Sequence, residues 1–340
     1  MPRMADAARR AGVALGTVSN VLNQPEKVSE HTRMRVHRAI EELGFVPNRA
    51  ARLLAAGTSS TIGFVIIDLS NSFFLDMARG AEREAHEHGL SVLLADSDMQ
   101  DGKQKTYLQL FNEERVAGVL LAPLPGTLTE MRAIRERGTR VVVLNDFAGA
   151  DTCSVSVDNE LGGYTATRHL IQTGRRRLVF AGEHRGVGPL DERAHGAARA
   201  IAETNGAVTM EFLPTHEVQV EQGREVGRLL AARPLGERPD GVVAAADLLA
   251  LGIVQAMLAD GVRIPDDVAI IGYDNNRSAW ESVVPISTIA QPGEDMGHVA
   301  TRLLLDELRS GADHVHEHVV LKPTLIVRSS SGAVPLTGAG

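Results

Sequence analysis

From Thr61 onward, short apolar runs alternate with longer amphipathic stretches, and this alternation limits the fold more than any other feature of the 340 residues. The amphipathic stretches, such as 74–88 and 103–113, have helical spacing. The apolar runs have the length of strands and occupy residues 62–67, 91–95, 118–121 and 140–144. Runs of this length without polar alternation are typical of strands buried on both faces of a parallel sheet. We therefore expect an α/β fold with helices on both sides of the sheet.

A second series of the same kind follows the first. Its expected strands lie near 178–181, 209–213, 241–245 and 268–271, and its expected helices at 159–173, 191–205, 217–232 and 247–260. Two successive series predict two doubly wound parallel-sheet subdomains within residues 61–330, with crossings between them near 158 and 290. In such sheets a ligand binds beyond the carboxyl ends of the strands, so we expect a ligand cleft between the subdomains.

The first 47 residues have a different, all-α pattern. An alanine-rich helical stretch at 4–11 stops at Gly12, and a second helix is expected at 15–22. A third begins after Ser29, a suitable N-cap, and ends at Gly44, with Pro47 preventing any continuation. Two short helices around a glycine turn with a third behind them predict a helix-turn-helix, whose second helix enters the major groove of DNA. From the helices alone, a three-helix module that binds another protein remains open.

The distribution of charge favours DNA at this end of the chain. The net charge of the whole chain is -8, which by itself argues against nucleic acid. Residues 1–60, however, hold nine basic and five acidic residues, a balance of +4. The other 280 residues hold 26 basic and 38 acidic residues, a balance of -12. A basic end on an acidic body is expected when only that end touches phosphates.

Particular residues of the first 48 resemble a known signature. They include Ala11-Gly12-Val13, Thr17-Val18-Ser19, Val21-Leu22-Asn23, Val28-Ser29-Glu30 and the run Ile40-Glu41-Glu42-Leu43-Gly44-Phe45. In these positions the chain resembles the lactose-repressor/galactose-repressor family of transcriptional regulators. The resemblance implies a helix-turn-helix headpiece (1–47), a hinge helix and linker (48–60), two subdomains of periplasmic-binding-protein type (61–330) and a tail (331–340). It further implies a homodimeric repressor that binds a palindromic operator and responds to a small effector, a sugar or a nucleoside.

The resemblance assigns DNA contacts to the second helix and the hinge. It implies that Thr17, Ser19 and Asn23 anchor phosphates, and that Leu15, Gly16 and Asn20 face the bases. Two positions depart from the common pattern: Ala14 replaces a serine that would cap the helix, and Asn20 replaces an arginine that reads guanine. Since asparagine prefers adenine, we expect an operator that differs from the usual half-site where residue 20 lands.

The hinge helix is expected at 48–57, with Arg49 among its DNA contacts. By the match, Leu54 is the apolar wedge that enters the minor groove and bends the duplex. The alternative is that Leu53 and Leu54 pack against the body of the protein.

The match continues at lower density through the effector domain, where it implies a set of ligand contacts. Phe73 and Phe74 are expected to sandwich a sugar ring, with Asn71 near its hydroxyls. The remaining expected contacts are Asp158, Arg193, Asp274 and Gln291. Each has an ordinary alternative: core packing for the two phenylalanines, a surface ion pair for Arg193, a turn for Asp274 and a helix N-cap for Asp158.

Three departures bear on the effector. Ala246 replaces an asparagine that binds ligand in many relatives, Asn145 replaces an aspartate, and no aromatic residue lies near Val218. They leave open a ligand other than a common hexose. They also leave open a regulator of the same fold that has no small-molecule effector, or that is controlled by a partner protein.

The sequence favours no catalytic, metal or membrane function. It has no Gly-x-x-x-x-Gly-Lys phosphate loop and no Gly-x-Ser-x-Gly turn, so we expect no enzyme and no cofactor. His314, His316 and His318 alternate, but no cysteine or acidic residue accompanies them at a metal-binding spacing, and we expect no metal. Without a span of about 20 apolar residues or an apolar leader, the expected location is the cytoplasm.

Overall fold

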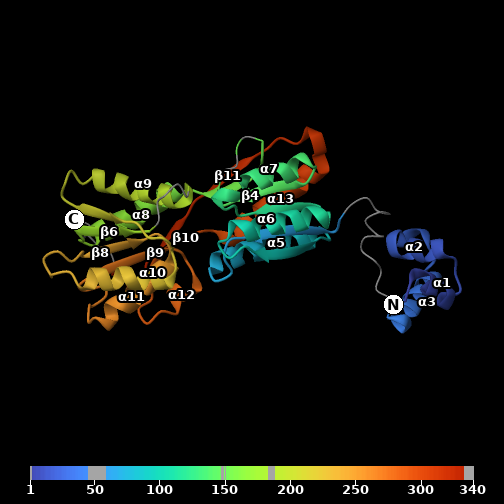
Figure 1. The fold of residues 1–340 in the computed structure, drawn as a ribbon, viewed down its shortest axis with the longest axis horizontal. Coiled ribbons are helices and arrows are strands. Elements are labelled where there is room, and N and C mark those ends of the chain that lie inside the picture. The colour runs from blue at the N-terminus through green and yellow to red at the C-terminus, as the bar shows by residue number, and fades with distance from the viewer. Residues whose placement is uncertain (1, 45–58, 147–148, 150, 183–187, 333–340) are drawn as a thin grey trace, which may run out of the picture. The chain divides into compact units, whose positions relative to one another are not determined.

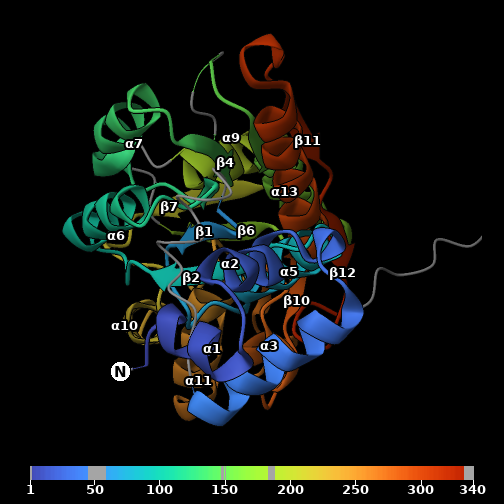
Figure 2. The same cartoon turned by 90° about the vertical axis from the view of Figure 1, so that its right-hand side faces the viewer.

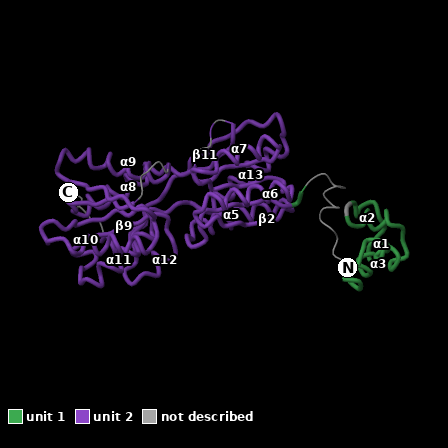
Figure 3. Tube along the Cα trace, in the orientation of Figure 1, with its two compact units in different colours: residues 1–60 green, residues 61–340 purple. Residues whose placement is uncertain are grey.

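The computed structural model describes residues 2–44, 59–146, 149, 151–182 and 188–332. The chain divides into two compact units, residues 1–60 and 61–340, coloured separately in Figure 3. The hinge helix expected at 48–57, with Arg49 and Leu54, lies outside the described residues. None of the described helices is both long and apolar enough to cross a membrane.

The first unit contains the three expected helices, α1 (Met4–Ala11), α2 (Leu15–Asn23) and α3 (Glu30–Leu43), with a short 3-10 turn η1 (Pro25–Lys27) before α3. Gly12 and Gly44 take positive φ angles of 62° and 58° where α1 and α3 end. This is the left-handed conformation that glycine adopts without a steric penalty. Small buried side chains let the helices approach closely; they are Ala7, Ala8, Ala11, Val18, Val21, Val36 and Ala39.

The first subdomain of the second unit has a six-stranded parallel sheet in the order β11-β5-β4-β3-β1-β2. Its strands are β1 (Thr61–Ile66), β2 (Ser91–Asp96), β3 (Gly118–Leu121), β4 (Arg140–Leu144), β5 (Ser154–Val157) and β11 (His318–Leu321). Helices α5 (Ser72–Glu87) and α13 (Gly293–Ser310) pack on one face. Helices α6 (Asp101–Glu113) and α7 (Leu128–Glu136) pack on the other, as Figure 2 shows, with η2 (Pro125–Thr127) before α7.

The second subdomain repeats this architecture with the strand order β12-β10-β9-β8-β6-β7. Its strands are β6 (Arg177–Ala181), β7 (Thr209–Leu213), β8 (Gly241–Ala244), β9 (Ala269–Asp274), β10 (Ser287–Ala290) and β12 (Thr324–Ile326), of which only β12 is antiparallel to its neighbour. Helices α10 (Val220–Ala231) and α11 (Asp247–Ala259) cover one face; α8 (Asn159–Gln172) and α9 (Gly188–Ala202) cover the other. Two short elements complete the second unit. They are α12 (Arg277–Trp280), which follows β9, and η3 (Gly311–Asp313), which lies between α13 and β11.

The chain passes between the subdomains three times (Figure 1). It leaves the first after β5, returns between β10 and α13, and leaves again between β11 and β12. The third passage was not expected from the sequence. The fold class is confirmed: a helical headpiece precedes two doubly wound, mainly parallel subdomains.

Candidate functional site

One face of α2 is exposed and the opposite face is buried. Leu15 is 51% exposed, and Gly16 and Asn20 also face solvent, while Val18 and Val21 lie in the core. Thr17 and Ser19 are half-buried beside this face, and Asn23 is the last residue of the helix. The residues expected to face the bases therefore lie together on the exposed side, and Thr17 and Ser19, two of those expected to anchor phosphates, flank it.

The turn before α2 is held from behind by α3. The guanidinium of Arg35 donates hydrogen bonds to the carbonyl oxygens of Ala11 (2.5 Å) and Gly12 (3.1 Å). Ala14 occupies the N-cap of α2 and makes no side-chain cap bond, so the helix lacks a hydroxyl cap, as the sequence predicts. The first turn of α2 thus has backbone N–H groups that can donate to a phosphate.

A cavity of about 430 Å³ lies between the two subdomains, beyond the carboxyl ends of their strands. Its lining includes six of the seven residues expected to contact an effector: Asn71, Phe73, Phe74, Arg193, Asp274 and Gln291. The seventh, Asp158, is not part of the lining. Its carboxylate accepts from the backbone N–H of Leu161 at 2.8 Å and caps α8. A ligand contact for Asp158 stays a prediction.

Arg193 is 4% exposed, which excludes the surface ion pair considered from the sequence. Its guanidinium donates to the Asn159 side chain (3.0 Å) and to the carbonyl oxygen of Ala245 (2.7 Å). It lies 3.7 Å from the centre of the Tyr273 ring and 3.7 Å from the carboxylate of Asp274. Because the guanidinium is buried and contacts two hydrogen-bond acceptors, an aromatic ring and a carboxylate, it is fixed in position before any ligand binds.

Asp274 ends β9 with a φ of 104°, an unusual conformation for a residue with a side chain. The carboxylate accepts from Asn71 at 2.9 Å and from Gln291 at 2.7 Å. Burial raises the pKa of Asp274, while the neighbouring Arg193 and the two amides oppose this shift. Because Asn71 belongs to the first subdomain and Asp274 to the second, this carboxylate joins the two.

Phe73 and Phe74 form one apolar wall of the cavity. Their ring centroids are 5.4 Å apart and the planes are inclined by 51°. A sugar ring stacked between two aromatic faces requires about 7 Å between them, twice an ordinary carbon–carbon contact. The expected sandwich between these two rings is therefore wrong, because adjacent residues at the start of α5 contact one another and present a shared surface instead.

Two acceptors in the cavity lack hydrogen-bond partners among the described residues. They are the side-chain carbonyl oxygens of Gln291 and Asn145, and both are buried. Gln291 already uses its amide nitrogen on Asp274, which leaves the oxygen for another donor. Buried polar atoms without partners are rare and cost free energy, so these two oxygens are the polar atoms of the lining residues that would gain most from a hydrogen-bond donor.

One functional contact could not be foreseen from the sequence. The amide of Gln219, from the second subdomain, donates to Asp68 of the first at 2.7 Å across the cavity. A further bond crosses nearby, from the backbone N–H of Arg277 to the hydroxyl of Ser72 at 3.0 Å. No local signal in the sequence pointed to Gln219, which lies 151 residues from Asp68.

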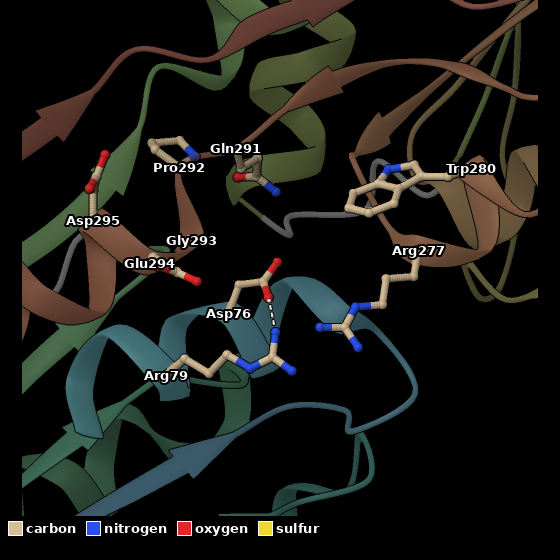
Figure 4. A pocket seen from close by; sticks show the side chains of 9 residues that line it. All are labelled: Asp76, Arg79, Arg277, Trp280, Gln291, Pro292, Gly293, Glu294 and Asp295. Atoms are coloured by element: carbon tan, nitrogen blue, oxygen red, sulfur yellow. Dashed lines mark hydrogen bonds and ion pairs between the residues drawn. The ribbon is translucent and has the colours of Figure 1, made fainter. Parts of the chain in front are cut away.

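A second, more open pocket of about 500 Å³ shares Gln291 with the cavity (Figure 4). Asp76 and Arg79 of α5 form an ion pair in it at 3.2 Å, and Arg277 extends toward the same carboxylate. Of its other charged side chains, Glu294 at the start of α13 pairs with Arg83 at 3.1 Å. This pocket offers no apolar wall comparable with that of the first, and we take the first as the candidate effector site.

The sequence has close relatives over almost its whole length. Residues 3–48 match the family described as bacterial regulatory proteins, lacI family, and residues 167–331 match a periplasmic binding protein-like domain. HTH-type transcriptional regulator RegA of Clostridium saccharobutylicum is 33% identical, over 96% of this chain and 98% of that protein. HTH-type transcriptional repressor PurR of Photobacterium profundum is 30% identical, over 97% of this chain and 98% of that protein.

Solved structures agree with these relatives. The complex of the transcriptional regulator CelR with cellobiose is 30% identical, covers 97% of this chain and 100% of that chain, and has a TM-score of 0.69. The lac repressor dimer bound to operator and the anti-inducer ONPF has a TM-score of 0.81 over 98% and 99% of the two chains. At 24% identity, the second match establishes the shared fold alone.

Proposed function

Because the chain belongs to the lacI family of bacterial regulatory proteins, and is thus a DNA-binding transcriptional regulator, we propose that it acts as a dimeric repressor on a palindromic operator. We further propose that a small, neutral, hydroxyl-rich effector in the cavity between the subdomains controls it. The two unpartnered acceptors, Gln291 and Asn145, carry the second proposal.

On the DNA side, α2 lies in the major groove with Leu15, Gly16 and Asn20 toward the bases. Thr17, Ser19, Asn23 and Arg49 hold phosphates, and Leu54 enters the minor groove. The exposed face of α2 supports the first part of this assignment, since its residues have no packing role in the headpiece. Because the side chain at position 16 is only a hydrogen, base selection at this face falls to residues 15 and 20.

A homodimer places one headpiece on each half of the operator, because two-fold protein symmetry matches a palindrome. The lac repressor, which shares this fold, was solved as a dimer on its operator. The proposed partners are thus the operator DNA, a second copy of the chain and the effector. The proposed location of the protein is the cytoplasm.

The charge of the cavity argues for a neutral effector. Three carboxylates, Asp68, Asp146 and Asp274, line it against one guanidinium, Arg193, so an anionic ligand would meet net repulsion. Acceptor oxygens favour a ligand that brings hydroxyl donors, and the wall of Phe73 and Phe74 suits the C–H face of a sugar ring. CelR was solved with cellobiose, and a LacI family transcriptional regulator from Enterococcus faecium with ribose.

The proposed control follows from contacts to both subdomains. Asn145 and the two phenylalanines belong to the first, and Arg193 and Gln291 to the second. A ligand that satisfies both sets favours one angle between the subdomains, and this angle sets the spacing of the paired hinges on DNA.

Thermal-shift measurements of the full chain against neutral mono- and disaccharides, nucleosides and sugar phosphates test the effector. A neutral sugar at 100 times its Kd should stabilise the protein by about 2.7 kcal/mol, and sugar phosphates should not. Gln291→Ala and Asn145→Ala should weaken the binding of that sugar roughly tenfold each, for one lost hydrogen bond. Gln222→Ala, a partly exposed position outside the cavity, serves as the matched control.

Operator affinity with and without the same sugar then tests the coupling. A sugar that stabilises the protein but leaves operator affinity unchanged would contradict effector control. A chain that no small molecule stabilises, yet that binds its operator tightly, would instead support the alternative of control by a partner protein.

A further inference from the structure

A cluster of metal-ligand side chains lies at the opposite end of the first subdomain from the effector cavity. Cys153 directly precedes β5, His314 and His316 precede β11, and Glu307 lies near the end of α13. Parallel pairing of β5 with β11 aligns their amino ends, and α13 packs alongside. One donor atom from each of the four side chains lies within 4.8 Å of the others.

The spacing of the donors matches that of a tetrahedral site. The Cys153 sulfur is 3.1 Å from Nε2 of His314 and 3.6 Å from Nδ1 of His316. Metal–sulfur and metal–nitrogen bonds of about 2.3 and 2.1 Å at tetrahedral angles place sulfur and nitrogen about 3.6 Å apart. One separation therefore already has this value, and the other requires only a small side-chain movement.

Glu307 supplies an independent reason for a cation at this place. The residue is 2% exposed, and its Oε2 has no hydrogen-bond partner among the described residues. The other oxygen lies 3.8 Å from the guanidinium of Arg140, too far for a hydrogen bond. A buried carboxylate that is half satisfied is costly, and coordination of a cation by Oε2 would remove that cost.

Burial affects the two kinds of donor differently. It raises the pKa of the Cys153 thiol, which by itself opposes formation of the thiolate, so the case for a metal rests on the geometry of the donors. Burial also lowers the pKa of His316, which keeps the imidazole neutral with a lone pair to donate. The backbone N–H of Glu317 points at the sulfur at 3.4 Å and would stabilise a thiolate.

We propose that Cys153, Glu307, His314 and His316 bind one divalent transition-metal ion of the zinc type. Thiolate, imidazole and carboxylate together are the donors that zinc accepts in four-coordinate sites. As the metal–sulfur bond forms, the thiol proton passes to solvent, and no redox step is involved. The ion would hold the start of the edge strand β11 against β5 and α13.

His318 is excluded from the site and provides its control. It is the third imidazole of the alternating segment, but its Nδ1 lies 3.0 Å from the hydroxyl of Ser154 and the residue is exposed. His318→Gln therefore keeps the length and polarity of the segment while removing a histidine that the proposal does not use.

The experiment uses the full-length protein, stripped with a chelator and titrated with Co²⁺, followed by competition with Zn²⁺. We expect one equivalent of Co²⁺ to give a thiolate-to-cobalt charge-transfer band with the intense visible bands of tetrahedral cobalt, and Zn²⁺ to bleach both. Cys153→Ser should abolish the charge-transfer band, and His316→Gln should weaken binding at least tenfold. His318→Gln should bind like the unaltered chain.

Three results would overturn the assignment. They are the absence of a charge-transfer band, a band that survives Cys153→Ser, and equal weakening by His316→Gln and His318→Gln, which would indicate adventitious binding by surface imidazoles. An affinity unchanged by Glu307→Gln would contradict the fourth ligand. Circular dichroism of each variant, and its operator binding, separate loss of the site from failure to fold.

Discussion

At the scale of single residues, Asp247 at the start of α11 is the most deeply buried carboxylate of the second subdomain, with no exposure at all. Its Oδ2 accepts from the backbone N–H of Asn276 at 2.6 Å, and its Oδ1 has no partner among the described residues. Burial raises its pKa well above the ordinary value, and the nearby Asp274 adds to the shift. Asp247 thus supports the loop after β9 at the cost of a buried charge.

Asp247→Asn should stabilise the protein in a pH-dependent way. A carboxyl whose pKa is raised in the folded state contributes stability below its unfolded pKa of about 3.9 and loses that contribution as the pH rises through the folded value. The asparagine keeps an acceptor for Asn276 and never ionises. We expect a gain of about 1–3 kcal/mol near pH 8 that shrinks toward pH 4.

Urea unfolding of both proteins across this pH range measures the effect. Asp306→Asn, at a half-exposed position of α13, should change stability little at any pH. A variant at position 247 that is less stable than the parent at high pH would show that the carboxylate charge itself supports the loop.

The proposed metal ligands lie far apart in the sequence. The alternating histidines are visible there, but no cysteine or acidic residue accompanies them at a metal-binding spacing, so the sequence alone predicts no metal. Cys153 lies 161 residues before His314 and reaches it only because β5 and β11 pair. The effector residues were easier to predict because they fall in short segments that resemble a known family.

At the scale of elements, glycines bring helices into direct backbone contact. A Cβ added to Gly163 of α8 would overlap the carbonyl oxygen of Arg193, and one added to Gly196 of α9 would overlap that of Glu160. The same reciprocal pattern joins α5 with α13 and α10 with α11. Arg193 belongs to α9 and lines the effector cavity, so the contact between α8 and α9 also sets the position of its guanidinium.

Gly163→Ala should therefore impair stability and effector binding together. The methyl group has only backbone to displace, so α9 must move away from α8, which we expect to cost about 1–3 kcal/mol. Gly102→Ala is the matched control, because it also lies in a helix but meets no atom within 4 Å. That substitution should be neutral or stabilise by up to about 1 kcal/mol.

Chemical denaturation and effector titration of both variants test this pair. Parent-like effector affinity in Gly163→Ala would show that α9 accommodates the methyl group without moving Arg193.

Strands that form continuous apolar runs were predictable from the sequence, and β5, β11 and β12 were not. β1, β3, β8 and β9 are continuous apolar runs and lie close to the expected places. β5 has alternating serines, one of which bonds His318 of the neighbouring strand, so its burial is hidden in the sequence. β11 and β12 are short, partly exposed edge strands whose partners are remote.

At the scale of the whole effector domain, several hydrogen bonds link the subdomains beside the cavity. They join Asp68 with Gln219, Asn71 with both Asp274 and Asn276, and Ser72 with the backbone of Arg277. The bonds to Asp68 and Asp274 involve a carboxylate, and such bonds contribute about 1.5–3 kcal/mol. These bonds thus stabilise one arrangement of the two subdomains even when no ligand is bound.

Gln219→Ala should weaken this link and favour a wider angle between the subdomains in the effector-free protein. Small-angle X-ray scattering should show a larger radius of gyration without effector, returning to the parent value when effector saturates the cavity. Gln222→Ala, whose amide bonds Glu225 within the same helix, should leave the profile unchanged. A Gln219→Ala profile identical to that of the parent would mean that the remaining bonds suffice.

The three passages between the subdomains have a consequence for synthesis on the ribosome. The first sheet lacks its edge strand β11, and one of its faces lacks α13, until residues 293–321 have been made. Met296, Ala300, Leu303 and Leu304 of α13 share that face with α5, so its apolar strands are only partly covered while the whole intervening subdomain is translated. The first subdomain is therefore the first part of the domain to be synthesised but the last to be completed. The nascent chain is exposed to aggregation or proteolysis during that interval.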